Sequence, residues 1–177
     1  MNFSGIKILF TDSCSLIILE KSGLISHLQE NFTIYTILEV KEETLKKPKI
    51  KNEQRYKILE EFFQDIFFYT DNIKSTSLPV DKKLFLALEH FKKYQADIKV
   101  AMLTDDKKII KRLYKKEHFF INALLIPAVL YHREIISLSA AKSYMNIIKE
   151  NSRYSKEVIR YAENILSSSR ALKIDQL

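Results

Sequence analysis

Short apolar runs alternate along the chain with segments in which apolar residues recur three and four positions apart. The short runs are apolar throughout or alternate with polar residues, and they predict strands at 6–11, 32–36, 66–70, 98–104 and 119–122. The segments between them have helical spacing, at 13–21, 24–31, 37–47, 52–64, 82–94 and 107–116. Strands that alternate with helices at such short range indicate an α/β fold, with a parallel sheet of about five strands flanked by helices.

Two boundaries are marked by composition. The helix at 37–47 is expected to end at Pro48, and residues 71–80 are expected to form a loop. Beyond residue 122 the pattern predicts helices only, at 123–131, from a cap at Ser137 or Ser139 to about Lys149, and at 152–167.

Because 177 residues suit one domain, we expect a single domain over 1–177, with a core at about 6–122 and additional C-terminal helices at about 123–170.

Composition narrows the range of functions. The chain has two glycines and neither a G-x-G-x-x-G nor a G-x-x-x-x-G-K pattern, which excludes nucleotide-binding loops of those types. Lys and Arg number 29 against 22 Asp and Glu. The resulting net charge of +7 favours a polyanionic partner about as much as it favours a merely lysine-rich surface.

Three features of the sequence bear on the cellular compartment of the protein. Cys14 is the single cysteine, which excludes an internal disulfide and a cysteine-based zinc site and suits a reducing compartment. The N-terminus shows no signal-peptide pattern, and no apolar stretch reaches the ~18 residues that span a bilayer. We therefore expect a cytoplasmic protein with no membrane partner.

Acidic residues follow several of the predicted strands. Asp12 ends the first strand, Glu43 lies early in the helix after the second, Asp81 is placed to cap the helix after the third, and Asp105 and Asp106 follow the fourth. The strands of a parallel sheet share one polarity, so these acids are expected to meet at one edge of the sheet. Asp97 precedes the fourth strand instead, and is expected at the opposite edge.

Carboxylates gathered in one crevice repel one another unless a cation neutralises them. An all-oxygen cluster suits Mg²⁺ or Mn²⁺, which would activate water and stabilise the charge that develops on a phosphodiester. The simpler interpretation is that Asp12 and Asp81 are helix N-caps. Glu39 is the alternative to Glu43, since the two lie one helical turn apart on the same face.

Four short motifs together resemble the PIN domain family of metal-dependent ribonucleases. They are the strand and acid of Phe10-Thr11-Asp12-Ser13-Cys14, the Val40 and Glu43 pair after a strand, Asp81-Lys82-Lys83-Leu84-Phe85-Leu86-Ala87, and Met102-Leu103-Thr104-Asp105-Asp106. The four motifs occur together in the order and spacing of the family, which makes the resemblance more specific than any one motif. The resemblance covers residues 6 to 122, and the later helices are compatible with it.

This resemblance implies a PIN-like fold and a metal-dependent endoribonuclease that leaves 5′-phosphate and 3′-hydroxyl ends. It implies that Asp12, Glu43, Asp81 and Asp106 are the catalytic, metal-binding acids, with Mg²⁺ or Mn²⁺ as cofactor. The choice of Glu43 over Glu39 and of Asp106 over Asp105 rests mainly on the family motifs. Free-standing PIN domains are often toxins of type II toxin–antitoxin pairs, so an antitoxin protein and a homodimer are expected partners beside RNA.

Other residues are expected to support this site. Ser13 and Thr104 would be supporting hydroxyls by the resemblance, and Asp105 would be a further metal ligand, a partner of the ligands or a helix cap. Asn122 ends the fifth strand and either touches the site or, more simply, caps the next helix. Basic residues just after the acids either bind substrate phosphates or form a solvated helix face: Lys82, Lys107, Lys108 and Lys111.

Three other functions are compatible with the sequence. A PIN-like nuclease with a role in RNA processing or with a DNA substrate would carry the same acids. A nucleic-acid-binding module that has the fold but no catalytic activity would also have a positive net charge. A phosphatase of a doubly wound fold is disfavoured, because Asp12 is followed by Ser13 and Cys14 and no partner acid stands two residues later.

Overall fold

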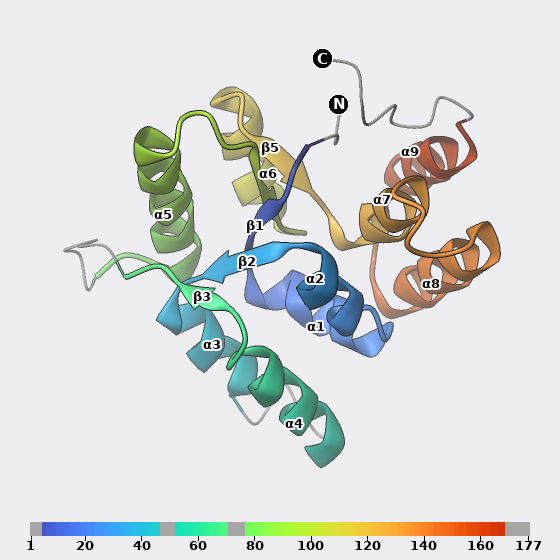
Figure 1. Ribbon diagram of the computed structural model, residues 1–177, viewed down its shortest axis with the longest axis horizontal. Coiled ribbons are helices and arrows are strands. Elements are labelled where there is room, and N and C mark those ends of the chain that lie inside the picture. The colour runs from blue at the N-terminus through green and yellow to red at the C-terminus, as the bar shows by residue number, and fades with distance from the viewer. Residues whose placement is uncertain (1–4, 47–51, 71–76, 169–177) are drawn as a thin grey trace.

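A five-stranded parallel sheet forms the centre of the molecule (Figure 1). The computed structural model describes residues 5–46, 52–70 and 77–168. The strand order is β3-β2-β1-β4-β5, and every neighbouring pair is parallel. The predicted α/β fold class is therefore confirmed. The strands are β1 (Ile8–Thr11), β2 (Thr33–Thr36), β3 (Phe67–Phe68), β4 (Val100–Leu103) and β5 (Phe119–Ile121).

Helices cover the sheet and extend beyond it. Contacts among α1, α2, α3 and α4 group these helices together, and Figure 1 shows α5 and α6 on the other side of the sheet, with α7, α8 and α9 packed at one end. Their bounds are α1 Ser13–Lys21, α2 Ile25–Asn31, α3 Leu38–Leu45, α4 Glu53–Phe62, α5 Val80–Tyr94, α6 Lys107–Lys115, a 3₁₀ turn η1 Ala123–Leu125, α7 Ile126–His132, α8 Leu138–Asn151 and α9 Lys156–Ser167.

The central strand β1 sets the register of the sheet. Phe10 lies opposite Tyr35 of β2 on one side and opposite Met102 of β4 on the other. Leu9 and Phe10 have no exposed surface, and all of β4 is buried. Strands that are covered on both faces read as continuous apolar runs, which is why the sequence pattern located them. The register also fixes which residues follow β1 and β4 at the same edge.

Several predicted boundaries were wrong. The strand predicted at 66–70 is reduced to Phe67–Phe68. The helix predicted at 123–131 begins as the 3₁₀ turn Ala123–Leu125, with Asn122 as its cap, and continues as α7. The helix predicted at 152–167 begins only at Lys156, because Ser155 is its N-cap. The preceding residues thus form an extended connection between α8 and α9.

Asp81 is not the N-cap that the sequence pattern predicted. The helix begins at Val80, and the amides of Lys82 and Lys83 donate to the carbonyl oxygen of Pro79, at 3.0 and 3.1 Å. Pro79 therefore occupies the cap position, and Asp81 lies inside the first turn, where an acid still favours the helix dipole. The predicted helix end at Pro48 and the predicted loop residues 71–76 lie outside the described residues.

One buried ion pair joins α1 to α4. The side chain of Glu20 is 4% exposed, and its Oε2 accepts hydrogen bonds from Nε of Arg55, at 2.6 Å, and from Nη2 of the same residue. A buried carboxylate is tolerated only while its partner stays in place. The pair therefore fixes α4 against the helix that follows β1.

Replacing Arg55 with Met is expected to destabilise the protein by about 3 kcal/mol, because it leaves the Glu20 carboxylate buried and unpaired. Chemical unfolding followed by circular dichroism would measure the loss. The double variant Glu20→Gln/Arg55→Met should recover most of it. As a control on the same helix, Lys57→Met removes an exposed pair with Glu53 and should change stability by less than about 0.5 kcal/mol. Equal losses for the two single variants would contradict this account.

Candidate active site

The strand order reverses between β1 and β4, because the segments that follow these two neighbouring strands lead to opposite sides of the sheet. From β1 the chain proceeds through α1 and α2 to β2, whereas from β4 it proceeds through α6 to β5 on the other side. In open α/β sheets, ligands bind beyond the carboxyl ends of the strands where such a reversal occurs. Asp12 follows β1 directly and Asp105 follows β4 after Thr104, so both acids stand at this position.

Asp12 is a buried carboxylate that begins α1. Its Oδ1 accepts the amide of Ser15 at 2.8 Å, and its Oδ2 accepts the hydroxyl of Thr104. Only 8% of the residue is exposed. Burial away from water raises the pKa of Asp12 from 3.8 to about 6, and the charge of Asp105 adds to the rise, whereas the hydrogen bonds from Thr104 and Ser15 oppose it. Asp12 is therefore both a helix cap and a destabilised anion.

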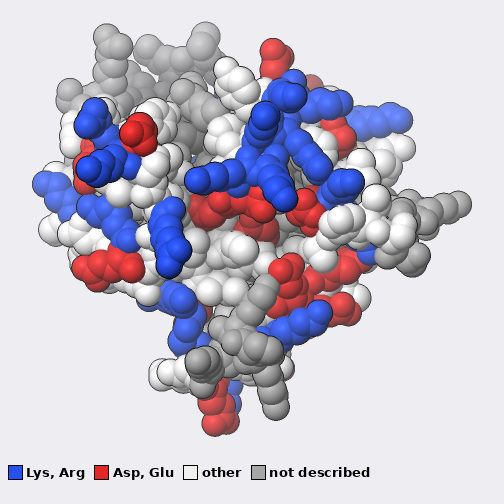
Figure 2. Space-filling view, turned by 180° about the vertical axis from the view of Figure 1, so that it is seen from behind, with Lys and Arg blue, Asp and Glu red and all other residues white. Residues whose placement is uncertain are grey.

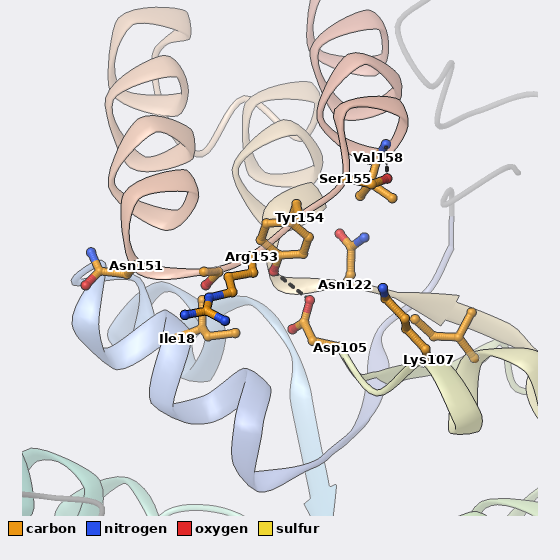
Figure 3. A pocket seen from close by; sticks show the side chains of 11 residues that line it. Ile18, Asp105, Lys107, Asn122, Asn151, Arg153, Tyr154, Ser155 and Val158 are labelled. Atoms are coloured by element: carbon orange, nitrogen blue, oxygen red, sulfur yellow. Dashed lines mark hydrogen bonds between the residues drawn. The ribbon is translucent and has the colours of Figure 1, made fainter.

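Asp105 is the second acid of this site. Its Oδ2 accepts the hydroxyl of Ser15 at 2.8 Å and the amide of Ala123 at 3.2 Å. Its Oδ1 accepts the hydroxyl of Tyr154 at 2.6 Å, the bond drawn in Figure 3. Desolvation raises the pKa of Asp105, and the bonds from Tyr154 and Ser15 act against that rise. Ser15 thus binds both carboxylates, through its amide to Asp12 and through its hydroxyl to Asp105.

The structure gives Asp106 a different place from Asp105. Asp106 caps α6, since its Oδ1 accepts the amides of Lys108 at 2.6 Å and Ile109 at 3.1 Å. Its own amide donates to the hydroxyl oxygen of Thr104 at 3.2 Å. Of the two neighbouring acids, it is Asp105 whose side chain shares Ser15 with Asp12. The family motif had favoured Asp106 as the partner of Asp12.

The remaining predicted acids lie on α3 and α5. Glu39 pairs with Lys83 at 2.7 Å, and this bond lowers the pKa of Glu39. Glu43 lies one turn further along α3, half-buried, and Asp81 lies in the first turn of α5. Among the described residues, no three His, Cys, Asp or Glu side chains form a group that could hold a metal ion. The structure therefore brings Asp12 and Asp105 together but does not assemble the predicted cluster of four acids.

A pair of carboxylates still suits a hard cation. Mg²⁺ keeps several waters and is commonly held by one or two carboxylates together with substrate phosphate oxygens. Asp12 and Asp105 are two anions that burial makes unfavourable, and a cation would relieve that cost. Each carboxylate oxygen can accept more than one hydrogen bond, so their present partners do not use all of their acceptor capacity. The donor set therefore fits Mg²⁺ or Mn²⁺.

The predicted supporting residues have definite positions. Ser13 is buried at the first position of α1, and Thr104 is buried between Asp12 and Asp106. Asn122 caps η1 by accepting the amide of Leu125 at 3.1 Å, the simpler of its two predicted roles. It also lines a cavity beside Asp105.

Sequence reasoning missed Ser15 and Tyr154. The spacing of Ser15 from Asp12, three residues into a helix, is a signal that could have identified its amide as the partner of the cap. No local signal could have identified Tyr154, because it lies 49 residues from Asp105 in the sequence. The apolar spacing predicts a helix over 152–167 that includes Tyr154, whereas the structure places Tyr154 in the connection before α9.

Basic side chains gather beside acidic ones at the surface. Figure 2 shows Lys and Arg collected over the region of α6, next to a strip of Asp and Glu. The predicted phosphate-binding residues on the described surface are all exposed: Lys82, Lys107, Lys108 and Lys111. Such a surface would attract a polyanion towards the acids.

Comparisons with known proteins give no identity. The chain matches no protein-family model, no curated protein and no solved structure. Within the residues that the structure describes, no helix is both long and apolar enough to cross a membrane.

Replacing Asp12 with Asn is expected to stabilise the metal-free protein at neutral pH. Because the folded-state pKa is raised from 3.8 to about 6, the wild type loses stability as pH rises through that window, by roughly 2–3 kcal/mol in all. The amide can still accept from Ser15, and its NH₂ group can donate to Thr104. The stability gained by the variant should therefore grow between pH 4 and 6 and level off above.

Unfolding by urea in the presence of a chelator, repeated across this pH range, would measure the difference. Asp97→Asn is the control, because Asp97 is exposed at the opposite edge of the sheet. A difference between Asp12→Asn and wild type that stays constant from pH 4 to 8 would show that Asp12 carries no burial penalty.

Proposed function

We propose that this protein is a metal-dependent endoribonuclease that uses Mg²⁺ or Mn²⁺. The observation that supports it most directly is a pair of carboxylates, the buried Asp12 and the half-buried Asp105, that share Ser15 where the strand order reverses. Burial of two neighbouring acids is unfavourable for folding, and such perturbed groups are typical of functional sites. The resemblance of four motifs to PIN domains supplies the reaction and the substrate class.

The proposed mechanism assigns a task to each residue of the site. Asp12 and Asp105 would hold the cation, which when bound activates water and neutralises charge on the phosphodiester. Ser15 and Thr104 keep the two carboxylates oriented by the hydrogen bonds described above. Tyr154 fixes the other oxygen of Asp105. The products would carry 5′-phosphate and 3′-hydroxyl ends, as in PIN nucleases.

The Lys and Arg side chains over α6 support a nucleic-acid substrate. Lys107 and Lys108 begin the helix that Asp106 caps, so their charges follow the site directly in the chain. Contacts from cations to phosphates fix the register of a bound strand, and these two lysines would make such contacts on either side of the cleaved bond. The net charge of +7 adds attraction over longer range.

Role and partners rest on the resemblance alone. A toxin of a type II toxin–antitoxin pair, acting in the cytoplasm as a homodimer and neutralised by an antitoxin protein, is the form we propose. A nuclease of RNA processing or of DNA would use the same site. The lack of a third acid grouped with Asp12 and Asp105 among the described residues favours a different candidate, a nucleic-acid-binding module without catalysis.

Cleavage of a fluorescent single-stranded RNA with Mn²⁺ or Mg²⁺ would distinguish these functions. Asp12→Asn and Asp105→Asn are each expected to lower the rate on the order of 100-fold or more, because each removes a charged ligand from the site. Asp106→Asn should be milder than Asp105→Asn, since Asn also caps a helix. Asp97→Asn should cleave like the wild type.

Thermal unfolding with and without Mn²⁺ supplies a readout that does not depend on activity. Mn²⁺ should raise the midpoint of the wild type and not that of Asp12→Asn, because a ligand that binds only the folded state stabilises it. RNA binding without cleavage by the wild type, and no stabilisation by Mn²⁺, would favour the non-catalytic module. A rate unchanged in Asp12→Asn would reject the mechanism as assigned.

A further inference from the structure

A cavity of about 310 Å³ opens beside Asp105, between the sheet and the C-terminal helices (Figure 3). One wall comes from the residues that follow β4 and β5, and another from the connection between α8 and α9. This connection is extended rather than helical: Ser152, the C-cap of α8, has φ −145° and ψ 156°, and Ser155, the N-cap of α9, has φ −73° and ψ 158°. The non-helical connection before α9 therefore forms one wall of the cavity.

Two cations line this cavity. Lys107 comes from the first turn of α6 and Arg153 from the connection, and Figure 3 shows them to either side of Asp105. Both residues are exposed, and within the described part of the chain neither forms an ion pair. Cations held beside a cavity without an internal partner favour an anionic ligand, and a planar guanidinium suits phosphate in particular.

The lining also offers groups that suit a heterocycle. Asn122 uses its Oδ1 to cap η1, so its NH₂ group remains as a donor, and Asn151 donates its NH₂ group to Ile147, so its Oδ1 remains as an acceptor. Ile18 and Val158 supply apolar wall. Tyr154 adds a ring whose hydroxyl is already bound to Asp105. A free phosphate ion would leave this apolar and aromatic surface unused.

We propose that this cavity receives the base of one unpaired nucleotide of the RNA, next to the bond that is cleaved, with Arg153 and Lys107 on its phosphates. The proposal rests on the proposed ribonuclease function. Proteins read single-stranded RNA by placing unstacked bases against aromatic or guanidinium planes and by hydrogen bonds to their edges. Asp105 connects the two sites, because it lines the cavity and also shares Ser15 with Asp12. A paired base could not enter, so the enzyme would act on single strands.

Binding can be separated from cleavage by using the Asp12→Asn protein with a chelator present. Isothermal titration with the four nucleoside 5′-monophosphates is compared with ribose 5-phosphate and with inorganic phosphate. At least one nucleotide is expected to bind about tenfold or more tightly than ribose 5-phosphate, since stacking and edge contacts add to the phosphate contact. Equal binding of nucleotides and ribose 5-phosphate would overturn the proposal, leaving only a phosphate site.

Single substitutions test whether the nucleotide binds in this cavity. Arg153→Ala should weaken nucleotide binding by about tenfold, whereas Arg160→Ala and Lys142→Ala, which remove exposed charges of α9 and α8 outside the cavity, should not. Val158→Phe fills the cavity without changing the charge, and should abolish nucleotide binding while inorganic phosphate still binds. Circular dichroism and unfolding midpoints confirm that each variant is folded. Unchanged nucleotide binding in both Arg153→Ala and Val158→Phe would place the ligand elsewhere.

The two proposals fail in different ways. If the wild type cleaves RNA with Mn²⁺ but Val158→Phe cleaves with the same KM and base preference, the cavity proposal is wrong and the ribonuclease stands. If nucleotides bind in the cavity but the wild type cleaves no RNA, the ribonuclease is wrong and the nucleotide site stands. Cleavage of single strands with a base preference that Val158→Phe removes, and no cleavage of a fully paired duplex, is the result expected.

Discussion

The burial of the Asp12 carboxylate is the constraint on which the site depends. The acid must end β1, the central strand, and this position leaves only 8% of the residue exposed. A carboxylate so deprived of water is retained only if donors replace the lost hydration. The amide of Ser15 and the hydroxyl of Thr104 supply that replacement, and they tie α1 to the end of β4.

Hydrogen bonds connect Asp12 and Asp105 both to the sheet and to the C-terminal region. The hydroxyl of Ser15 donates to Asp105, and Asp105 in turn accepts from Tyr154, which lies in the connection between α8 and α9. The C-terminal helices are also joined to one another, since Nε2 of His132 in α7 donates to the carbonyl oxygen of Ile165 in α9 at 2.7 Å. The C-terminal region thus contributes a side chain to the site, and its packing determines how Asp105 is oriented.

The fold was largely predictable because β1 and β4 are buried strands and the helices between the strands have one apolar side. Buried parallel strands give continuous apolar runs, and the helices between them give helical spacing. Boundaries that depend on caps were less predictable. Pro79 rather than Asp81 occupies the cap of α5, and Ser155 rather than Ser152 begins α9. Each difference is a shift of a few residues, but the second leaves the connection before α9 as part of the wall of the cavity beside Asp105.

The sequence by itself determined that Asp12 ends a buried strand and that acids follow the fourth strand at the same edge. This much follows from periodicity, because strands of one polarity deliver their ends together. Only the tertiary structure decided that Asp105 rather than Asp106 shares Ser15 with Asp12. Adjacent residues point in different directions, and which one turns inward depends on whether the other is used to cap α6. The bond to Tyr154 likewise joins residues far apart in the chain, and no local pattern encodes it.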